Sequence, residues 1–269
     1  MIERLKPIIQ KVSELQLGRY HTAGLTFDTK ASPCDFVSEV DIKSQEMIVG
    51  AIEKEFPEAG VLGEEGVQKK VEDSGYLFVI DPLDGTSNYR SKLDCWAVSV
   101  GLLKNGYVYE GIISIPSTGT IICSPELQPN RKFTFTSNEE LFLFGTDRVF
   151  EQQTFPFKYL KKRIFGATVP TIYYCFKEAF QGRPGFDFAL LGTPKLWDIA
   201  GAAACLKQLG GSLLDLEGTD LLETNLISKY RNHDETITKS FPVIASLSPE
   251  IAKLILGTIQ IQQKQAASF

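Results

Sequence analysis

Apolar residues recur at helical spacing in several segments of this chain. The first segment begins at Ile2 and is followed by Gly18, which we expect to end a helix. The second begins at Ser38, where Asp41 three residues later gives the pattern of a capped helix start, and it ends before Pro57. The same spacing predicts three more helices, over 172–182, 196–209 and from 249 onward.

Short apolar runs bounded by turn residues predict β-strands in the rest of the chain. Asn105-Gly106 is typical of a hairpin turn, so the runs around it predict an antiparallel meander over 95–123, with a second turn at 116–119. Other predicted strands cover 61–62, 76–80, 163–166, 186–191, 212–216 and 241–246. The polar stretch 26–33 predicts a loop, and the aromatic stretch 133–157 predicts core strands with a covering loop.

Length and composition are those of a folded, water-soluble protein. The 269 residues suffice for one large domain or two closely packed halves, and no repeat or linker divides them. Hydrophobic residues make up 43% and charged residues 23%, which is ordinary for a globular chain. The net charge of −5 argues against a dedicated nucleic-acid binder but allows a small anionic substrate beside a bound metal. The sequence has neither a run long enough to span a membrane nor a signal-peptide pattern.

Several common catalytic patterns are missing from the sequence. The five cysteines are scattered without a Cys-x-x-Cys pair, which indicates reduced thiols in the cytoplasm rather than disulfides or a zinc site. Only His21 and His233 are available to a histidine-dependent hydrolase. The chain contains no Gly-x-Gly-x-x-Gly, no Gly-Lys-Ser/Thr loop and no Gly-x-Ser-x-Gly elbow. If the protein is an enzyme, carboxylates must carry most of its chemistry.

The stretch 81–89, which reads Asp-Pro-Leu-Asp-Gly-Thr-Ser-Asn-Tyr, is the most informative part of the sequence. Asp81 and Asp84 come directly after a predicted strand, and Gly85 allows a tight backbone path behind them. Thr86 or the serine after it can start a helix whose free N–H groups would lie beside the two carboxylates. Two hard oxygen ligands next to an anion-binding backbone are what a metal-assisted phosphate site requires. The same dipeptides, Asp-Pro and Asp-Gly, are also typical of an ordinary turn.

Further acidic positions allow two interpretations each. Glu64 and Glu65 follow a short apolar run and are flanked by glycines, which fits metal ligands at a strand end as well as a solvated loop. Asp41 and Asp198 lie in the first turns of predicted helices, where an acidic side chain stabilises the helix dipole without any further role. Residue type and spacing leave both interpretations open.

Four motifs with these acidic residues follow one another along the chain. They are Lys30-x-Ser32-Pro33 with the segment from Asp35 to Asp41, then Gly63-Glu64-Glu65, Asp81-Pro82-Leu83-Asp84-Gly85-Thr86-Ser87-Asn88, and Trp197-Asp198-Ile199-Ala200-Gly201. Taken together, in this order, they resemble the inositol monophosphatase family, within the wider group of magnesium-dependent, lithium-sensitive phosphatases. The resemblance extends from about residue 30 to residue 211. It favours functional roles for the acidic residues over the turn and helix-dipole interpretations.

The resemblance implies an overall architecture. We expect an α/β fold, a layered sandwich in which helix and sheet layers alternate, as in inositol monophosphatase and fructose-1,6-bisphosphatase. A single phosphatase domain would cover 1–269, with a metal- and phosphate-binding half over 1–145 and a substrate half over 146–269. The resemblance also implies a homodimer. The composition predicts a cytoplasmic protein with no nucleic acid as main substrate and no membrane partner.

The resemblance further implies a metal site. Two or three Mg²⁺ ions would be held by Glu64, Asp81, Asp84, Asp198 and the backbone carbonyl of Leu83, with Asp81 bridging two of them. Asp198 would also face the substrate. All of these groups are hard oxygen donors, as Mg²⁺ prefers. Two metals roughly 3.5–4 Å apart can bind both the attacking and the leaving oxygen of an in-line displacement.

The resemblance assigns the remaining roles around the phosphate. Thr86, together with Asp41 and Glu64, would position and activate the attacking water. Backbone N–H groups around Gly85 and Thr86 would hold the phosphate. Glu65 would lie in an outer shell.

The implied reaction is hydrolysis of a small sugar or polyol phosphate, such as inositol 1-phosphate, by an activated water. Ser87-Asn88 departs mildly from the Thr-Asn pair common in the family. Relatives that hydrolyse 3′-phosphonucleotides tend to carry Lys-Glu there, which disfavours that activity. The stretch 190–196 lacks the acidic residue that often contacts a ring hydroxyl in inositol phosphatases. Fructose-1,6-bisphosphatase, histidinol-phosphatase and 3′-phosphonucleotide phosphatase are therefore alternatives, as is a non-catalytic regulatory protein that retains the fold.

Overall fold

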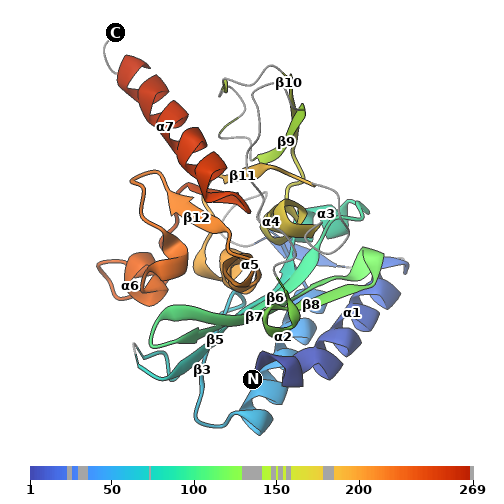
Figure 1. Ribbon diagram of the computed structural model, residues 1–269. Coiled ribbons are helices and arrows are strands. Elements are labelled where there is room, and N and C mark those ends of the chain that lie inside the picture. The colour runs from blue at the N-terminus through green and yellow to red at the C-terminus, as the bar shows by residue number, and fades with distance from the viewer. Residues whose placement is uncertain are drawn as a thin grey trace.

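The computed structural model describes residues 1–22, 26–29, 36–72, 74–128, 141–146, 150, 154–155, 159–177 and 185–266. In this part of the chain, helices lie on both outer faces of two large sheets and also between them (Figure 1). The expected α/β sandwich with alternating layers is confirmed. None of the helices described is long and apolar enough to cross a bilayer.

The first large sheet has the strand order β4-β3-β5-β6-β7-β8. Its strands are β3 (Gly60–Gly63), β4 (Gln68–Lys69), β5 (Tyr76–Asp84), β6 (Ala97–Lys104), β7 (Tyr107–Ile115) and β8 (Thr120–Cys123). Antiparallel pairing from β5 to β8 confirms the predicted meander, whereas β3 lies parallel to β5. Asn105 and Gly106 form the predicted turn with positive φ angles. β5 ends at Asp84 rather than at the predicted Ile80, so it contains both aspartates of the central motif.

The second large sheet has the strand order β10-β9-β11-β13-β12. Its strands are β9 (Leu141–Thr146), β10 (Tyr159–Arg163), β11 (Phe188–Leu191), β12 (Ser212–Asp215) and β13 (Val243–Ser246). The strand predicted over 163–166 is wrong in position, because the parallel pairing with β9 uses 159–163. β9 spans the expected boundary between the halves at 145/146 and pairs with β10 and β11.

A third, two-stranded sheet lies near the start of α2. It pairs β1 (Phe27–Thr29) with β2 (Phe36–Ser38) in antiparallel register. The loop predicted over 26–33 is therefore wrong at Phe27–Thr29, where a partner strand that the polar composition could not reveal supplies the backbone hydrogen bonds.

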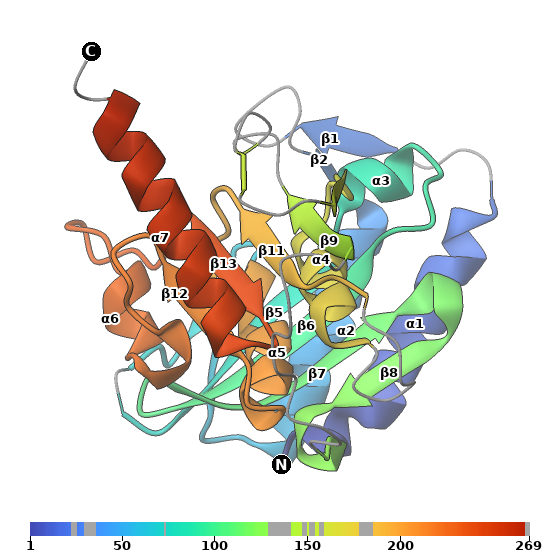
Figure 2. The same ribbon diagram turned by 45° about the horizontal axis from the view of Figure 1, so that its top comes forward.

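The helices form three layers around the two large sheets (Figure 2). One layer contains η1 (Ile2–Leu5), α1 (Lys6–Tyr20) and α2 (Glu39–Glu55), the middle layer contains α4 (Thr168–Phe176) and α5 (Leu196–Gln208), and the third is α7 (Pro249–Ala266). The shorter helices are α3 (Thr86–Arg90), α6 (Leu226–Tyr230), η2 (Pro116–Thr118), η3 (Ser124–Glu126) and η6 (Leu221–Glu223). The sequence pattern did not predict α6.

Alternating side chains on each strand connect the layers. In β5, Phe78 and Ile80 pack with α1 and α2, whereas Leu77 and Val79 belong to the cluster around α4 and α5. The period of two residues places successive side chains on opposite faces, so a continuous apolar run fits a sheet covered on both sides. The same alternation in β11 and β13 divides their side chains between the middle layer and α7.

Helix ends differ from the predictions in two places. α1 continues through Gly18 to Tyr20, whose ring lies 4.4 Å from Trp96, so tertiary packing outweighs the glycine. α4 begins at Thr168, before the predicted position 172, and the predicted end at 182 lies outside the described residues. The start of α2 is as predicted, because Ser38 and Asp41 form a capping box.

Glycines on the first sheet allow α5 to lie directly against it. A Cβ atom at Gly101 would lie 2.6 Å from the carbonyl carbon of Ala200, and one at Gly111 would clash with the carbonyl oxygen of Gly201. This close approach fixes the height of α5 above β5, β6 and β7, and α5 carries Asp198 in its first turn.

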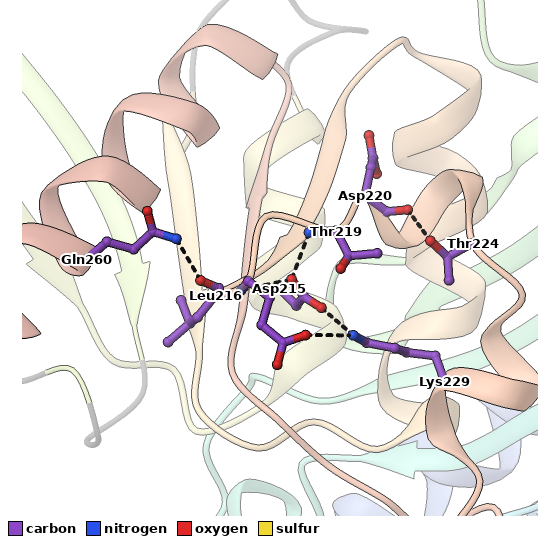
Figure 3. A network of polar contacts seen from close by, with 8 residues as sticks. Asp215, Leu216, Thr219, Asp220, Thr224, Lys229 and Gln260 are labelled. Carbon is purple, nitrogen blue, oxygen red and sulfur yellow. Dashed lines mark hydrogen bonds and ion pairs between the residues drawn. The ribbon is translucent and has the colours of Figure 1, made fainter.

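A polar network connects β12, the edge strand of the second sheet, with α6 and α7 (Figure 3). The carboxylate of Asp215 accepts a hydrogen bond from the Thr219 N–H at 2.8 Å and forms an ion pair with Lys229 at 2.5 Å. Gln260 of α7 donates to the carbonyl of Leu216 at 2.9 Å. These contacts hold the turn after β12 against both helices.

Candidate active site

A cavity of about 170 Å³ lies at the end of β5, beside the start of α5. Its lining consists of Glu64, Asp81, Leu83, Asp84, Gly85, Thr86, Ser87, Gly166 and Asp198. The structure thus brings together every residue that the sequence nominated for metal and phosphate binding. Asp41 is buried behind this lining and contacts it through Thr86.

A bulge in β5 directs two aspartates into one cavity. Asp81 is paired with Ser99 and Asp84 with Ala97, so three steps along β5 correspond to two along β6. In a regular strand, side chains three positions apart point to opposite faces, and the additional residue removes this difference. Within the bulge, the N–H of Leu83 donates to Asp81 Oδ1 at 3.1 Å.

Gly85 forms the sharp turn between β5 and α3. Its φ angle is 92°, and an added Cβ would lie 2.9 Å from the Cβ of Ala167 and 3.0 Å from the carbonyl oxygen of Cys95. Both the backbone conformation and the space require glycine. The turn brings Thr86 to the cavity, directly after Asp84.

Glu64 enters the cavity from the parallel neighbour of β5. Gly63 is paired with Ile80, and the N–H of Glu64 donates to the Ile80 carbonyl at 3.0 Å, which places Glu64 beside the β5 bulge. Gln45 of α2 holds the next residue, because its amide both donates to and accepts from the backbone of Glu65 at 3.1 Å. Glu65 itself is not among the lining residues.

Asp198 reaches the cavity from the middle layer. It lies in the first turn of α5, where its Oδ2 accepts a hydrogen bond from the N–H of Lys195 at 2.8 Å. Asp198 can accept the capping hydrogen bond and still present acceptor sites to the cavity, because a carboxylate has several of them.

Asp41 and Thr86 form a hydrogen-bonded pair at the edge of the cavity. Thr86 Oγ1 lies 2.9 Å from Asp41 Oδ1 and 3.1 Å from the carbonyl oxygen of Leu83. Asp41 Oδ2 accepts from the backbone N–H of Ser38 at 2.9 Å. Burial raises the pKa of Asp41, and the nearby charge of Glu64 adds to the increase, while hydrogen bonds from Ser38 and Thr86 oppose it.

The carboxylates create a strongly negative site. Burial raises the pKa of Asp81 well above its ordinary value, and the charges of Glu64, Asp84 and Asp198 raise it further. Burial likewise raises the pKa of Asp198, with Asp84 and Glu64 as the next causes. Carboxylates that share one cavity are stable together only when some of them are protonated or when a cation neutralises their charge.

The donor set suits a hard divalent cation. It comprises four carboxylates and the carbonyl of Leu83, all of them oxygen donors of the kind that Mg²⁺ and Ca²⁺ prefer. Among the described residues, no three His, Cys, Asp or Glu side chains already surround a common point as metal ligands. The residues therefore fit a metal by chemistry and location rather than by a preformed coordination sphere.

The sequence did not reveal that the segment before α4 contributes to the lining of the cavity. Asp84 accepts hydrogen bonds from the N–H groups of Thr168 at 3.1 Å and Val169 at 2.6 Å. Asn88 donates to the carbonyl of Phe165 at 2.6 Å, and Gly166 lines the cavity. The available signal is a glycine before a helix, but the apolar pattern there predicts a strand over 163–166. The motif residues Lys30, Ser32, Pro33 and Asp35 lie outside the described residues.

Sequence comparisons match nearly the whole chain. A family model described as "Inositol monophosphatase family" matches residues 1–246. The fructose-1,6-bisphosphatase/inositol-1-monophosphatase of Thermotoga maritima is 27% identical over 222 residues, which cover 76% of this chain and 81% of the relative. Inositol monophosphatase 1 of Sus scrofa is 26% identical over 238 residues, which cover 80% of this chain and 84% of the relative.

Solved structures share the fold at low sequence identity. The extragenic suppressor protein suhB of Bartonella henselae has a TM-score of 0.73 at 19% identity and covers 96% of this chain and 97% of its own. An IMPase from Thermotoga maritima has a TM-score of 0.71 at 23% identity, with coverages of 94% and 96%. An IMPase/NADP phosphatase in complex with Mg²⁺ and phosphate has a TM-score of 0.67 at 17% identity, with coverages of 94% and 91%.

Proposed function

Because the chain belongs to the inositol monophosphatase family, we propose that it is a Mg²⁺-dependent phosphomonoesterase acting on a small sugar or polyol phosphate. The family and the names of its relatives support a phosphatase. The observation that carries the proposal is the convergence of Glu64, Asp81, Asp84 and Asp198 on one cavity beside Thr86. Carboxylates in this number suit metal-assisted attack on a phosphate better than any structural role.

In this proposal, two or three Mg²⁺ ions are held by the four cavity carboxylates and the carbonyl of Leu83. A related IMPase/NADP phosphatase was solved in complex with Mg²⁺ and phosphate, which supports a divalent metal. When bound, the metal supplies Lewis acidity and a nucleophilic water at neutral pH. The chain's own contribution is to collect the negative charge at the end of β5, from β3, β5 and α5 together.

Thr86 and Asp41 are proposed to take the proton from the attacking water. Since Thr86 Oγ1 lies 2.9 Å from Asp41 Oδ1, the hydroxyl can donate its hydrogen to Asp41 and accept another from a water in the cavity. Burial raises the pKa of Asp41, which makes this carboxylate a stronger base than an exposed aspartate. Glu64, which lines the same cavity, is proposed to orient the same water.

The phosphate is proposed to bind at the turn that begins α3. Gly85, Thr86 and Ser87 line the cavity at this point, and the N–H groups of a first helical turn favour an anion. The absence of a side chain at Gly85 lets a ligand approach the backbone closely.

A phosphate-release assay on the purified protein tests the proposal. The substrates are sugar, polyol, amino-alcohol and nucleotide phosphates, each assayed with EDTA and then with added Mg²⁺. We expect release that disappears in EDTA and returns with Mg²⁺, and the family resemblance implies inhibition by lithium. Undiminished turnover in the chelator would overturn the metal-dependent mechanism.

A regulatory role is the second candidate. One structural neighbour is named for genetic suppression rather than for a reaction, namely the extragenic suppressor protein suhB. The absence of phosphate release from every substrate, in a protein that binds Mg²⁺ and remains folded, would favour this candidate.

We also propose a homodimer, which light scattering would detect as about twice the chain mass of 29.9 kDa.

A further inference from the structure

A glutamine in the helix layer of α1 and α2 contacts the bulge of β5. Gln16 lies in α1 and is fully buried, with 0% of its surface exposed. Its Nε2 donates to the carbonyl oxygen of Pro82 at 2.8 Å. Pro82 lies between Asp81 and Asp84, so this hydrogen bond is made at the centre of the segment that carries both carboxylates.

The bulge creates the need for this hydrogen bond. The register between β5 and β6 shifts between Asp81 and Asp84, so regular ladder pairing is interrupted at Pro82. A buried carbonyl without a partner is costly, and Pro82 lies in the buried part of β5, against the fully buried Gln16. Gln16 supplies the donor that a regular strand neighbour would supply elsewhere.

The orientation of the Gln16 amide is fixed by its other partners. Its Nε2 also donates to Ser44 Oγ at 3.1 Å, and its Oε1 accepts from Trp96 Nε1 at 3.2 Å. The hydroxyl of Tyr89 in α3 donates to the backbone carbonyl of Gln16 at 2.6 Å. If the amide were rotated by half a turn, its oxygen would face the Pro82 carbonyl oxygen and its N–H₂ group would face the N–H of Trp96. Neither pair can form a hydrogen bond, so one orientation is selected.

We propose that Gln16 is a positioning residue, which holds the β5 bulge in the shape that directs Asp81 and Asp84 into the same cavity. The inference rests on the proposed function insofar as these aspartates bind metal. Groups behind a metal ligand fix its orientation, and their removal typically lowers metal affinity about 10–100-fold. Gln16 acts on the ligands through the backbone of Pro82.

Two variants separate positioning from ordinary core packing. Gln16→Met keeps a long unbranched side chain but removes the hydrogen bonds to Pro82, Ser44 and Trp96. Val12→Ala is the control, because Val12 is fully buried one turn earlier in α1 and belongs to the apolar cluster beneath the sheet. Both variants weaken the core, and only the first removes the contact with the bulge.

The experiment measures Mg²⁺ binding and amide exchange in the full-length variants. Titration calorimetry with MgCl₂ in the presence of inorganic phosphate should give an affinity about 10–100-fold lower in Gln16→Met and unchanged in Val12→Ala. The Leu83 N–H, which donates to Asp81 Oδ1 inside the bulge, should exchange its hydrogen faster in Gln16→Met than in Val12→Ala.

Equal Leu83 exchange and equal Mg²⁺ affinity in the two variants would overturn the inference. If the wild-type protein binds no Mg²⁺, the proposed function fails, and the exchange rate of Leu83 alone then decides the role of Gln16. Trp96→Phe is the second variant if Gln16→Met does not fold, since it keeps an aromatic ring and frees only the amide oxygen. It should shift both measurements in the same direction by a smaller factor, and no shift would count against the inference.

Discussion

The side chain of Asp41 contacts the cavity lining through a hydrogen bond from the hydroxyl of Thr86. Thr86→Val keeps the shape of the side chain and removes the hydroxyl, so the proposed proton path to Asp41 is lost. General acid–base groups contribute about 10²–10⁴-fold, and we expect kcat to fall by a factor in this range with little change in KM. Steady-state kinetics at saturating Mg²⁺ provide the measurement. Thr86→Ser should recover most of the activity, and an unchanged kcat in Thr86→Val would remove the residue from the mechanism.

Asp84 lines the cavity and also accepts hydrogen bonds from the start of α4, and a single substitution affects both. Asp84→Asn removes a charge from the cavity and places an amide N–H₂ opposite one of the two N–H groups at the start of α4. We expect a large loss of kcat and of Mg²⁺ affinity, together with a loss of about 1–3 kcal/mol in the free energy of unfolding. Kinetics, calorimetry and urea denaturation measure these quantities. Near-normal kcat at saturating Mg²⁺ would refute the assignment of Asp84 as a metal ligand.

At the residue scale, the sequence predicted the cavity carboxylates but not the hydrogen bonds that hold them in place. Asp81, Asp84 and Gly85 are adjacent in a motif, so their types and spacing carried the information. The hydrogen bond from Gln16 to Pro82 joins residues 66 positions apart, and that from Val169 to Asp84 joins residues 85 positions apart. Such contacts depend on how separate layers pack, which the local pattern does not specify.

At the element scale, the network around Asp215 predicts a dependence of stability on pH. Burial alone would raise the pKa of Asp215, but hydrogen bonds from Lys229 and Thr219 outweigh it and the pKa is lowered. A lowered pKa in the folded state stabilises the protein above the ordinary carboxyl pKa of about 3.9, and this contribution is lost as the pH falls below that value.

The variant Asp215→Asn should therefore be less stable than the wild-type protein at pH 7. We expect a difference of about 1–3 kcal/mol in the free energy of unfolding, because the buried charged partner of the partly exposed Lys229 is removed. Urea denaturation at pH 7 and at pH 3 measures the difference. It should shrink at the lower pH, and a difference that is constant with pH would contradict this account.

The contact of α5 with the first sheet leads to a second prediction at this scale. Gly101→Ala would place a Cβ 2.6 Å from the carbonyl carbon of Ala200, so α5 must move away from β6. Overpacking of this kind costs typically about 1–3 kcal/mol in stability. Because α5 carries Asp198, Mg²⁺ affinity should fall as well, which calorimetry would measure. A variant with lower stability and wild-type affinity would show that Asp198 tolerates the shift.

The elements that the sequence predicted best are those with local partners. The meander of the first sheet follows from hairpin turns such as Asn105-Gly106, whose pairing is between neighbours in the chain. β10 was misplaced because its partner β9 is parallel, so no turn marks the register and basic residues such as Lys161 interrupt the apolar pattern. The short helix α6 was missed because five residues give too little periodicity to recognise.

At the scale of the whole molecule, the two halves are proposed to divide the substrate between them. The metal and phosphate would lie against β3 and β5, and the leaving alcohol would face the segment before α5. There, Leu190 and Leu191 are fully buried, whereas Thr193 is exposed and Lys195 is half-buried. This segment has no carboxylate to bind ring hydroxyls, and a site without such a partner discriminates weakly between alcohols.

We therefore expect that inositol 1-phosphate is not strongly preferred over other small phosphates. The measurement is kcat/KM for inositol 1-phosphate against fructose 1,6-bisphosphate, glycerol 2-phosphate and histidinol phosphate. A preference of more than about a hundredfold for inositol 1-phosphate over all three would show that another residue supplies the hydroxyl contact.

The position of α5 between the sheets has a consequence for biosynthesis. β8 is complete at Cys123, but the middle layer of α4 and α5, which covers the inner face of its sheet, is complete only at Gln208. At roughly 5–20 residues per second, that face is not fully covered on the ribosome for roughly 4–17 seconds. Side chains such as Val79 and Ile113 are exposed to other nascent chains during this interval. Soluble yield in cells should therefore depend on chaperones that shield the emerging first sheet.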